Sequence, residues 1–109
     1  MPANEALPLE VRQAVQRLGK NIRLARVRRR ISQEELAKAC QITRKTLYAI
    51  ETGIPGIAVG TLFSVLWALG LLDPAIALAD PDQDEHGKIL EAARQPQRVR
   101  HSPAIDNNF

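Results

Sequence analysis

The segment Ser32–Gly53, SQEELAKACQITRKTLYAIETG, constrains the fold most, because two helix starts stand close together in it. Ser32 and Glu35 have the S-x-x-E spacing of a capping box, which predicts that a helix begins there. Thr43 is a second N-cap candidate, and Gly53 is suited to a left-handed helix end. Since only two residues separate the two predicted helices, the helices must cross steeply. They therefore form a helix-turn-helix unit.

Apolar residues indicate which side of each helix faces the interior. Leu36, Ala37 and Cys40 lie on one face of the first helix. Leu47 and Ile50 repeat at core-facing spacing in the second. The outer face of the second helix then carries these residues: Arg44, Lys45, Tyr48, Ala49 and Thr52.

Arg44 and Lys45 stand at the start of that outer face. A DNA major groove admits one helix, and a recognition helix presents its N-terminal residues to the base edges. Two adjacent cations also suit an ordinary solvated face, so the pair alone fits either interpretation. The helix-turn-helix frame around the pair favours nucleic acid.

The chain from about Leu18 to Leu72 resembles the helix-turn-helix family of phage repressors and Xre-type regulators. The resemblance rests on Gln33, Glu34, Leu36, Ala37, Ile42, Thr43, Leu47, Ile50, Glu51 and Gly53. It implies an all-α, five-helix, lambda-repressor-like DNA-binding domain. Within this family the chain is similar to HipB-type antitoxins, through the string GTLFSVLWALGL after the motif, the short length and a polar C-terminal tail.

The resemblance also implies roles for individual residues. Those expected to read bases are Arg44, Lys45, Tyr48 and Ala49, the last through a thymine methyl group. Those expected to hold phosphates are Gln33, Thr43, Thr46 and Thr52. Arg26 falls near the buried stripe of the preceding helix, where a guanidinium needs a carboxylate. The family pattern pairs it with Glu51 as a structural ion pair. Many relatives carry glutamine at the base-reading positions, so their operator sequences do not transfer.

A long amphipathic helix is predicted before the motif, beginning at Pro8 as its first helical residue. Its core stripe is expected to be Val11, Val15, Leu18, Ile22 and Ala25. Residues 28–30, all arginine, would complete it. Cations favour a helix C-terminus without any ligand, and they would equally suit contacts with DNA phosphates.

After the motif, a nearly all-apolar helix is expected over Thr61–Leu69. Phe63 and Trp67 form a second apolar face there, which we expect to meet a second subunit in a homodimer. Coverage of Trp67 by the first helix is the alternative. Gly70 ends this helix, and Asp73 with Pro74 is expected to cap a short last helix that runs through Leu78.

Three regions follow from these patterns: a frayed N-terminus (1–7), the DNA-binding and dimerisation domain (8–79) and a polar tail (80–109), in which Glu85–Ala93 is expected to form a brief helix. Charge divides the chain at a different place. Residues 1–57 hold 11 Lys or Arg against 5 acids, while residues 58–109 hold 4 against 7. The basic half carries the motif, as a surface that faces phosphates requires.

Other chemistry is disfavoured by the sequence. Asp80, Asp82, Asp84 and Glu91 fit part of a calcium-loop frame, but its sixth position, which must turn sharply, is Glu85 instead of Gly. His86 and His101 are isolated, and the single cysteine, Cys40, is expected to be buried packing. We therefore expect no metal, no cofactor and no enzymatic activity. No apolar run reaches membrane-spanning length, and the expected location is the cytoplasm.

The function expected from the sequence is that of a dimeric repressor on a palindromic operator. The antitoxin resemblance adds a HipA-like kinase toxin as partner and autoregulation of the shared operon. Two alternatives stay open: a stand-alone Xre-type or phage-like regulator, and a protein-binding adaptor whose motif no longer binds DNA. Acidic or apolar residues in place of Arg44 and Lys45 would have favoured the adaptor.

Overall fold

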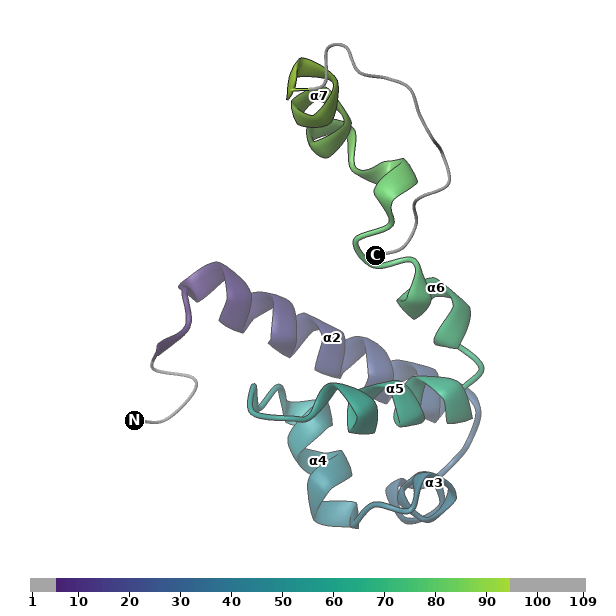
Figure 1. Cartoon of the computed structure of the whole chain (residues 1–109). Coiled ribbons are helices and arrows are strands. Elements are labelled where there is room, and N and C mark those ends of the chain that lie inside the picture. The colour runs from purple at the N-terminus through teal and green to yellow at the C-terminus, as the bar shows by residue number, and fades with distance from the viewer. Residues whose placement is uncertain (1–5, 95–109) are drawn as a thin grey trace. The chain divides into compact units, whose positions relative to one another are not determined.

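A computed structural model of the chain describes residues 6–94 and contains only helices in that part (Figure 1). The helices are α2 (Leu9–Arg28), α3 (Gln33–Cys40), α4 (Arg44–Thr52), α5 (Val59–Ala68), α6 (Leu72–Ile76), the 3₁₀ helix η1 (Pro81–Gln83) and α7 (Glu85–Arg94). The chain divides into two compact units, Met1–Ala75 and Ile76–Phe109. The predicted all-α fold, with five helices up to α6, is confirmed.

The core of the first unit lies where α3, α4 and α5 meet the second half of α2. Its fully buried side chains come one from each helix: Ile22, Leu36, Leu47 and Val65. α2 and α3 both pack on α4, and α3 also packs on α5, as Figure 1 shows. α4 buries Leu47, Ile50 and Glu51 on the side of this core, so its opposite face is free.

Gly19 allows α2 and α4 to approach closely, and the sequence analysis did not single it out. A Cβ added at Gly19 would lie 2.5 Å from the carbonyl oxygen of Ile50 and 2.8 Å from that of Glu51. Real Cβ atoms do not come so near to backbone oxygens, so only glycine fits this crossing. The end of α4 is thereby fixed against the middle of α2.

The boundaries of α2 differ from the prediction. Pro8 occupies the N-cap position before the helix, and the helix ends at Arg28 instead of including all three arginines. Arg30 adopts a left-handed conformation with φ of 55°, and the amide of Ile31 donates to the carbonyl of Arg26. Together with the bond from the Arg30 amide to the carbonyl of Val27, this bond makes a Schellman helix end, which closes the helix before the third arginine.

The expected core stripe of α2 is wrong in its first half. Val11 is 42% exposed and Leu18 is 36% exposed, whereas the buried residues of α2 begin at Gly19. The physical reason is length. α2 has 20 residues, about 30 Å, and extends beyond α4, which has nine.

The last helices of the first unit are also shifted. α5 begins at Val59, two residues before the predicted start, and ends at Ala68 before the left-handed Gly70 (φ 78°). α6 begins at Leu72, so Asp73 lies in its first turn instead of capping it, and it ends at Ile76 instead of Leu78. Ala79, with φ of 61°, follows soon after.

The second unit, as far as it is described, contains η1 and α7. The Asp80 side chain accepts a hydrogen bond from the amide of Asp82 and so caps η1. The expected brief helix at Glu85–Ala93 is present as α7 and extends to Arg94. Residues 1–5 and 95–109, including His101, lie outside the described residues.

Candidate nucleic-acid interface

The two helices of the motif are set by their caps. The Ser32 hydroxyl accepts from the amide of Glu35 at 3.0 Å, and the Glu35 carboxylate accepts from the amide of Ser32 at 2.8 Å, so the capping box is formed. At the next helix, the Thr43 hydroxyl accepts from the amide of Thr46 at 3.0 Å. Gly53 ends that helix with φ of 84°. Short-range bonds therefore fix both ends of α4.

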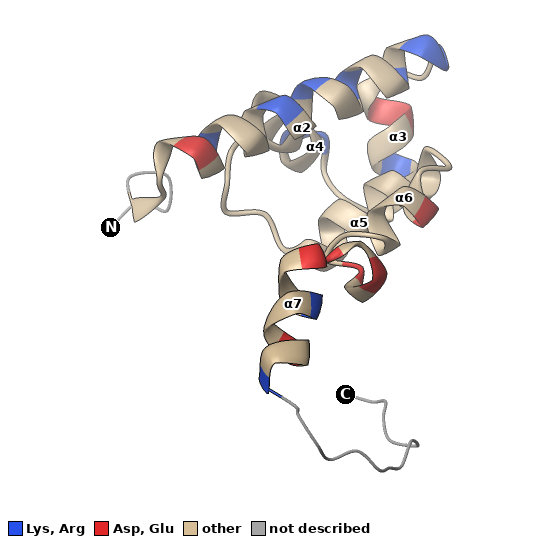
Figure 2. Ribbon diagram, turned by 90° about the horizontal axis from the view of Figure 1, so that it is seen from above, with Lys and Arg blue, Asp and Glu red and all other residues tan. Residues whose placement is uncertain are grey.

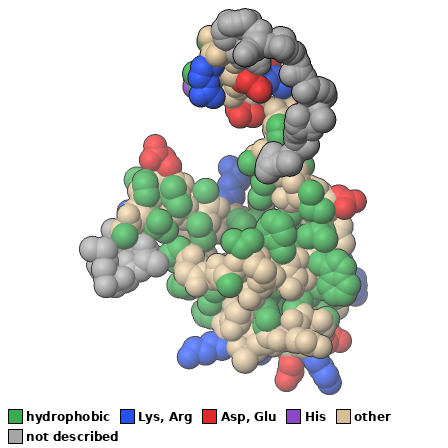
Figure 3. Space-filling model, in the orientation of Figure 1, with side chains coloured by type: hydrophobic (Ala, Val, Ile, Leu, Met, Phe, Trp, Pro, Cys, Tyr) green, Lys and Arg blue, Asp and Glu red, His purple; other side chains and the backbone are tan. Residues whose placement is uncertain are grey.

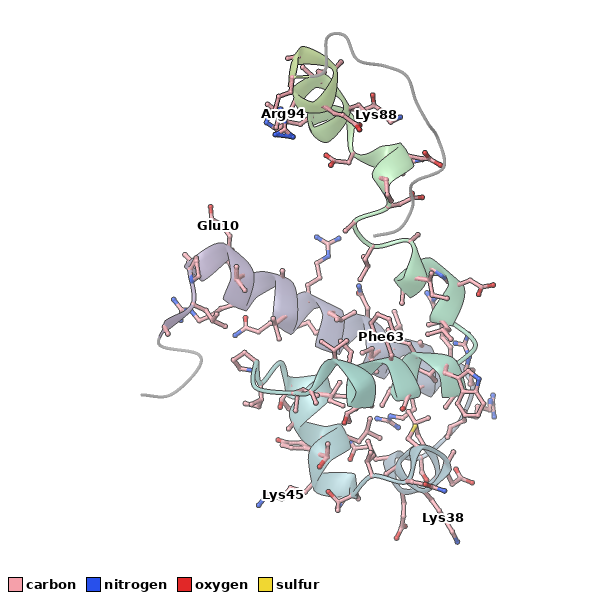
Figure 4. The ribbon with its side chains drawn as sticks, in the orientation of Figure 1. Glu10, Lys38, Lys45, Phe63, Lys88 and Arg94 are labelled. Carbon is pink, nitrogen blue, oxygen red and sulfur yellow. The ribbon has the colours of Figure 1, made fainter. Side chains whose placement is uncertain are left out.

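The free face of α4 carries the residues expected to read bases. Arg44 and Lys45 are exposed in its first turn, Tyr48 is 58% exposed one turn later, and Ala49 is half-buried beside it. In Figure 4, Lys45 projects from the start of α4 away from the body of the domain. Arg44, Lys45 and Tyr48 together line one shallow hollow on this face. A helix that offers long polar side chains at its N-terminal end fits the entry of a major groove.

A larger open hollow adjoins this face and joins three helices. Its lining residues are Arg23, Arg26, Ser32, Gln33, Glu34, Arg44 and Tyr48. It thus places the start of α3 beside the start of α4, with cations on two sides. Exposed N–H groups at a helix start and neighbouring guanidinium groups are both suited to phosphate oxygens.

Arg23 belongs to this hollow, yet the sequence analysis did not select it. Arg23 comes one helical turn before Arg26, and the crossing of α2 over α4 brings it near Arg44. The spacing of the two arginines on α2 was the available signal. Figure 2 shows that Lys and Arg continue along α2, so a single cation there does not stand out in the sequence.

Arg26 and Glu51 form a buried ion pair beneath the free face of α4. The guanidinium donates to both carboxylate oxygens, from Nε at 2.7 Å and from Nη2 at 3.0 Å, and Nη1 donates to the carbonyl of Ile31 at 2.9 Å. Arg26 is 8% exposed and Glu51 is 5% exposed. The pair joins α2 to the end of α4 and holds the orientation of α4.

The residues expected at phosphates are partly engaged within the protein. Gln33 donates through Nε2 to the Glu51 carboxylate at 3.0 Å, which holds its side chain beside the ion pair. The hydroxyls of Thr43 and Thr46 lie 2.9 Å apart and share a hydrogen bond. The Thr52 hydroxyl donates back to the carbonyls of Tyr48 and Ala49. Each hydroxyl oxygen keeps a lone pair, and the Gln33 amide keeps one N–H.

The three arginines at the end of α2 have different surroundings. Arg29 turns back and donates through Nη1 to the carbonyl of Ala25 at 2.8 Å, so it satisfies the helix end. Arg28 and Arg30 are exposed. The interpretation as helix-end cations therefore applies to Arg29.

The two residues expected at a dimer interface lie on α5 but differ in exposure. Trp67 is 64% exposed, whereas Phe63 is half-buried and packs against the core. Val59, 68% exposed, lies one turn before Phe63 on the same helix face. Figure 3 shows hydrophobic side chains gathered over α5 and the adjoining part of α2.

Two side chains of the motif have displaced pKa values. The hydrogen bond from the backbone of Ser32, supported by its hydroxyl, lowers the pKa of Glu35. Burial raises the pKa of the Cys40 thiol, whose sulfur lies 3.6 Å from the carbonyl oxygen of Ser64. A raised pKa makes the thiolate scarcer, which fits packing and not nucleophilic chemistry.

Within residues 6–94, no cluster of His, Cys, Asp and Glu side chains is arranged to hold a metal ion. None of the helices in that part of the chain is long and apolar enough to cross a membrane.

Comparison with known proteins agrees with this geometry. Residues 22–75, the motif with the helices that frame it, match the family described as Helix-turn-helix. Over these residues the chain is similar to helix-turn-helix domains, in agreement with the α3–α4 unit described above.

A solved structure, that of the clp gene regulator ClgR from Corynebacterium glutamicum, is similar over 83% of this chain and 98% of that one, with 28% sequence identity and a TM-score of 0.49. No curated protein matches the chain.

Proposed function

We propose that this protein is a sequence-specific transcriptional repressor that occupies a palindromic operator as a homodimer. The observation that carries the proposal is the free face of α4, where Arg44, Lys45 and Tyr48 are exposed. The caps at both ends of α4 and the buried ion pair beneath it hold this helix in place. Repression then follows from occupancy of the operator, and no reaction is required.

Each group of side chains has a separate task in this proposal. Arg44 and Lys45 enter the major groove and donate to acceptor atoms on base edges, as arginine and lysine do to guanine. Tyr48 and Ala49 contact the bases beside them. Gln33, Thr43, Thr46 and Thr52 meet phosphates, and Arg23 adds a cation from α2 at the same edge. Phosphate contacts fix the register, whereas base contacts supply the sequence preference.

A dimer is supported by the surface of α5. No charged residue occurs between Ile54 and Leu72, although Val59 and Trp67 are largely exposed. An uncharged, exposed apolar face of this kind marks an interaction surface. Pairing two copies through Val59, Phe63 and Trp67 would make two recognition helices equivalent across a two-fold axis.

Selection of bound duplexes from a random DNA pool tests this function. Two inverted half-sites are expected, with centres one helical turn or about 34 Å apart, because each copy reads one major groove. A single asymmetric half-site would contradict the dimer, and recovery of no preferred sequence would contradict specific recognition.

The HipB-like resemblance extends the proposal to an antitoxin with a HipA-like kinase as partner. Its support is the sequence resemblance alone, since the family match concerns only the DNA-binding domain. Co-expression with the product of the adjacent gene, followed by purification through one tagged component, decides the matter. A kinase that co-purifies supports the antitoxin role, while an adjacent gene that encodes no kinase favours a stand-alone regulator. In either case, we expect the protein to act in the cytoplasm.

A further inference from the structure

α7 has a largely apolar face that no described residue of its own unit covers. Its apolar members are Ile89, Leu90 and Ala93, and the polar His86 completes the spacing i, i+3, i+4, i+7. Ile89 is 65% exposed and Leu90 is 54% exposed. None of the described residues 76–94 of this unit is buried. Among the described residues of the unit, nothing packs this face into a core.

α7 also lacks the features that would make it stable alone. It has ten residues, and Gly87 lies in its first turn. Isolated helices shorter than about 12–15 residues are marginal in water, and an internal glycine costs about 1 kcal/mol relative to alanine. Its visible supports are one capping bond, from the Gly87 amide to Asp84, and the exposed Lys88–Glu85 pair at 3.4 Å. A packing partner would supply what is missing.

The pattern of apolar and charged positions in α7 is symmetric about the midpoint between Ile89 and Leu90. Read from either end, its apolar face has the same spacing, so residue 86 corresponds to residue 93 and residue 89 to residue 90. When the helix is read from the opposite end, each charged position carries the opposite charge. Glu85 corresponds to Arg94, and Lys88 corresponds to Glu91.

These two properties select one orientation of a helix pair. In a parallel pair of identical helices each charge would meet the same charge on the other copy. In an antiparallel pair the acidic start of each α7, with Asp82 and Asp84 just before it, lies beside the end of the other α7, which carries Arg94. The two apolar faces then meet in register, with Ile89 against Leu90 of the second copy.

We propose that α7 pairs antiparallel with α7 of a second copy of this chain, about a two-fold axis between Ile89 and Leu90. Two ten-residue helices bury too little surface to hold a dimer by themselves. The inference therefore rests on the proposed homodimer, in which the α5 contact raises the local concentration of the second α7. The α7 pair acts as a second clasp between the same two copies.

Disulfide trapping in the full-length protein tests the orientation. In a Cys40→Ser background, one copy carries His86→Cys and the other carries Ala93→Cys, and the mixture is oxidised at equilibrium. Antiparallel pairing predicts a disulfide between positions 86 and 93 of different copies, identified by mass spectrometry of the joined peptides. Disulfides that join 86 to 86 and 93 to 93 would show a parallel pair and overturn the proposal. Absence of any α7 disulfide would overturn it as well.

A charge exchange in the same cysteine variants tests the electrostatic argument. Glu85→Arg and Arg94→Glu, each placed in both copies, should lower the yield of the 86–93 disulfide, because like charges then meet at each end. The double variant should restore the yield. If the single variants leave the yield unchanged, or if the double variant fails to restore it, the proposed pairing is wrong.

Operator binding and the α5 contact are measured in the same samples, so failure of the two proposals can be told apart. A specific operator and a dimer without the 86–93 disulfide would reject only the α7 pair. The disulfide without a preferred operator would reject the proposed function and retain the α7 pair.

Discussion

Removal of the Glu51 carboxylate should nearly unfold the domain. Glu51→Ala takes away two of the three hydrogen bonds that the Arg26 guanidinium makes, and only the bond to the carbonyl of Ile31 remains. The side chain of Arg26 is 10% exposed and cannot regain the lost bonds from water. Breaking a buried ion pair on one side typically costs about 3–5 kcal/mol. Since small domains are stable by roughly 5–15 kcal/mol, this loss is a large fraction of the total.

Urea unfolding followed by far-ultraviolet circular dichroism measures this effect, with Glu34→Ala as the control. Glu34 is exposed and lies in the first turn of α3, so its removal should cost less than about 1 kcal/mol. The double variant Arg26→Met with Glu51→Leu should recover much of the loss, because apolar side chains of similar size can replace a buried ion pair. A Glu51→Ala protein as stable as the control would refute the view that this pair holds α2 to α4.

Three further predictions concern single side chains of the first unit. Gly19→Ala should lower stability by about 1–3 kcal/mol in thermal unfolding, because its Cβ would overlap the carbonyl of Ile50. The control Gly60→Ala, with open space around it, should raise stability by about 0.5–1 kcal/mol. Equal melting temperatures of the two variants would contradict the close helix crossing. The Cys40 thiol should react slowly with an alkylating reagent at neutral pH and quickly in urea, because burial raises its pKa; fast reaction of the native protein would mean that the thiol is accessible. Trp67→Ala should give a protein that is still helical and is monomeric in light scattering. The emission of Trp67, the single tryptophan, should shift to the red when the natural protein is diluted. An unfolded variant would place Trp67 in the core instead.

The elements near the motif could be predicted from the sequence because short-range bonds determine them. The box of Ser32 and Glu35, the cap at Thr43 and the left-handed Gly53 all involve residues within one helical turn. The C-terminal end of α2 depends instead on which groups donate to its last carbonyls. The Arg29 side chain and the Ile31 amide do so, and the run of three arginines does not reveal this.

The rest of the interface could not be predicted because it depends on contacts between distant segments. Gly19 matters only where α2 meets the carbonyls of α4, and Arg23 joins the hollow beside α4 only through the same crossing. Val11 has core-like spacing, yet it stays 42% exposed because this part of α2 extends beyond α4. The ion pair of Arg26 and Glu51 followed from family resemblance, because no local pattern connects residues 25 positions apart.

The affinity of single-residue variants for the selected operator tests the central claim most directly. Fluorescence anisotropy at one fixed salt concentration compares Arg44→Ala and Lys45→Ala with Lys20→Ala, which removes an exposed cation from a position that does not line the hollow beside α4. A base contact predicts a loss of about 1–3 kcal/mol on the operator, with a much smaller loss on unrelated DNA, for each recognition-helix variant. The Lys20 variant should weaken binding to both DNAs equally and only slightly. Recognition-helix variants that bind the operator as tightly as the unchanged protein, or lose the same affinity on both DNAs, would contradict the claim that α4 reads the operator.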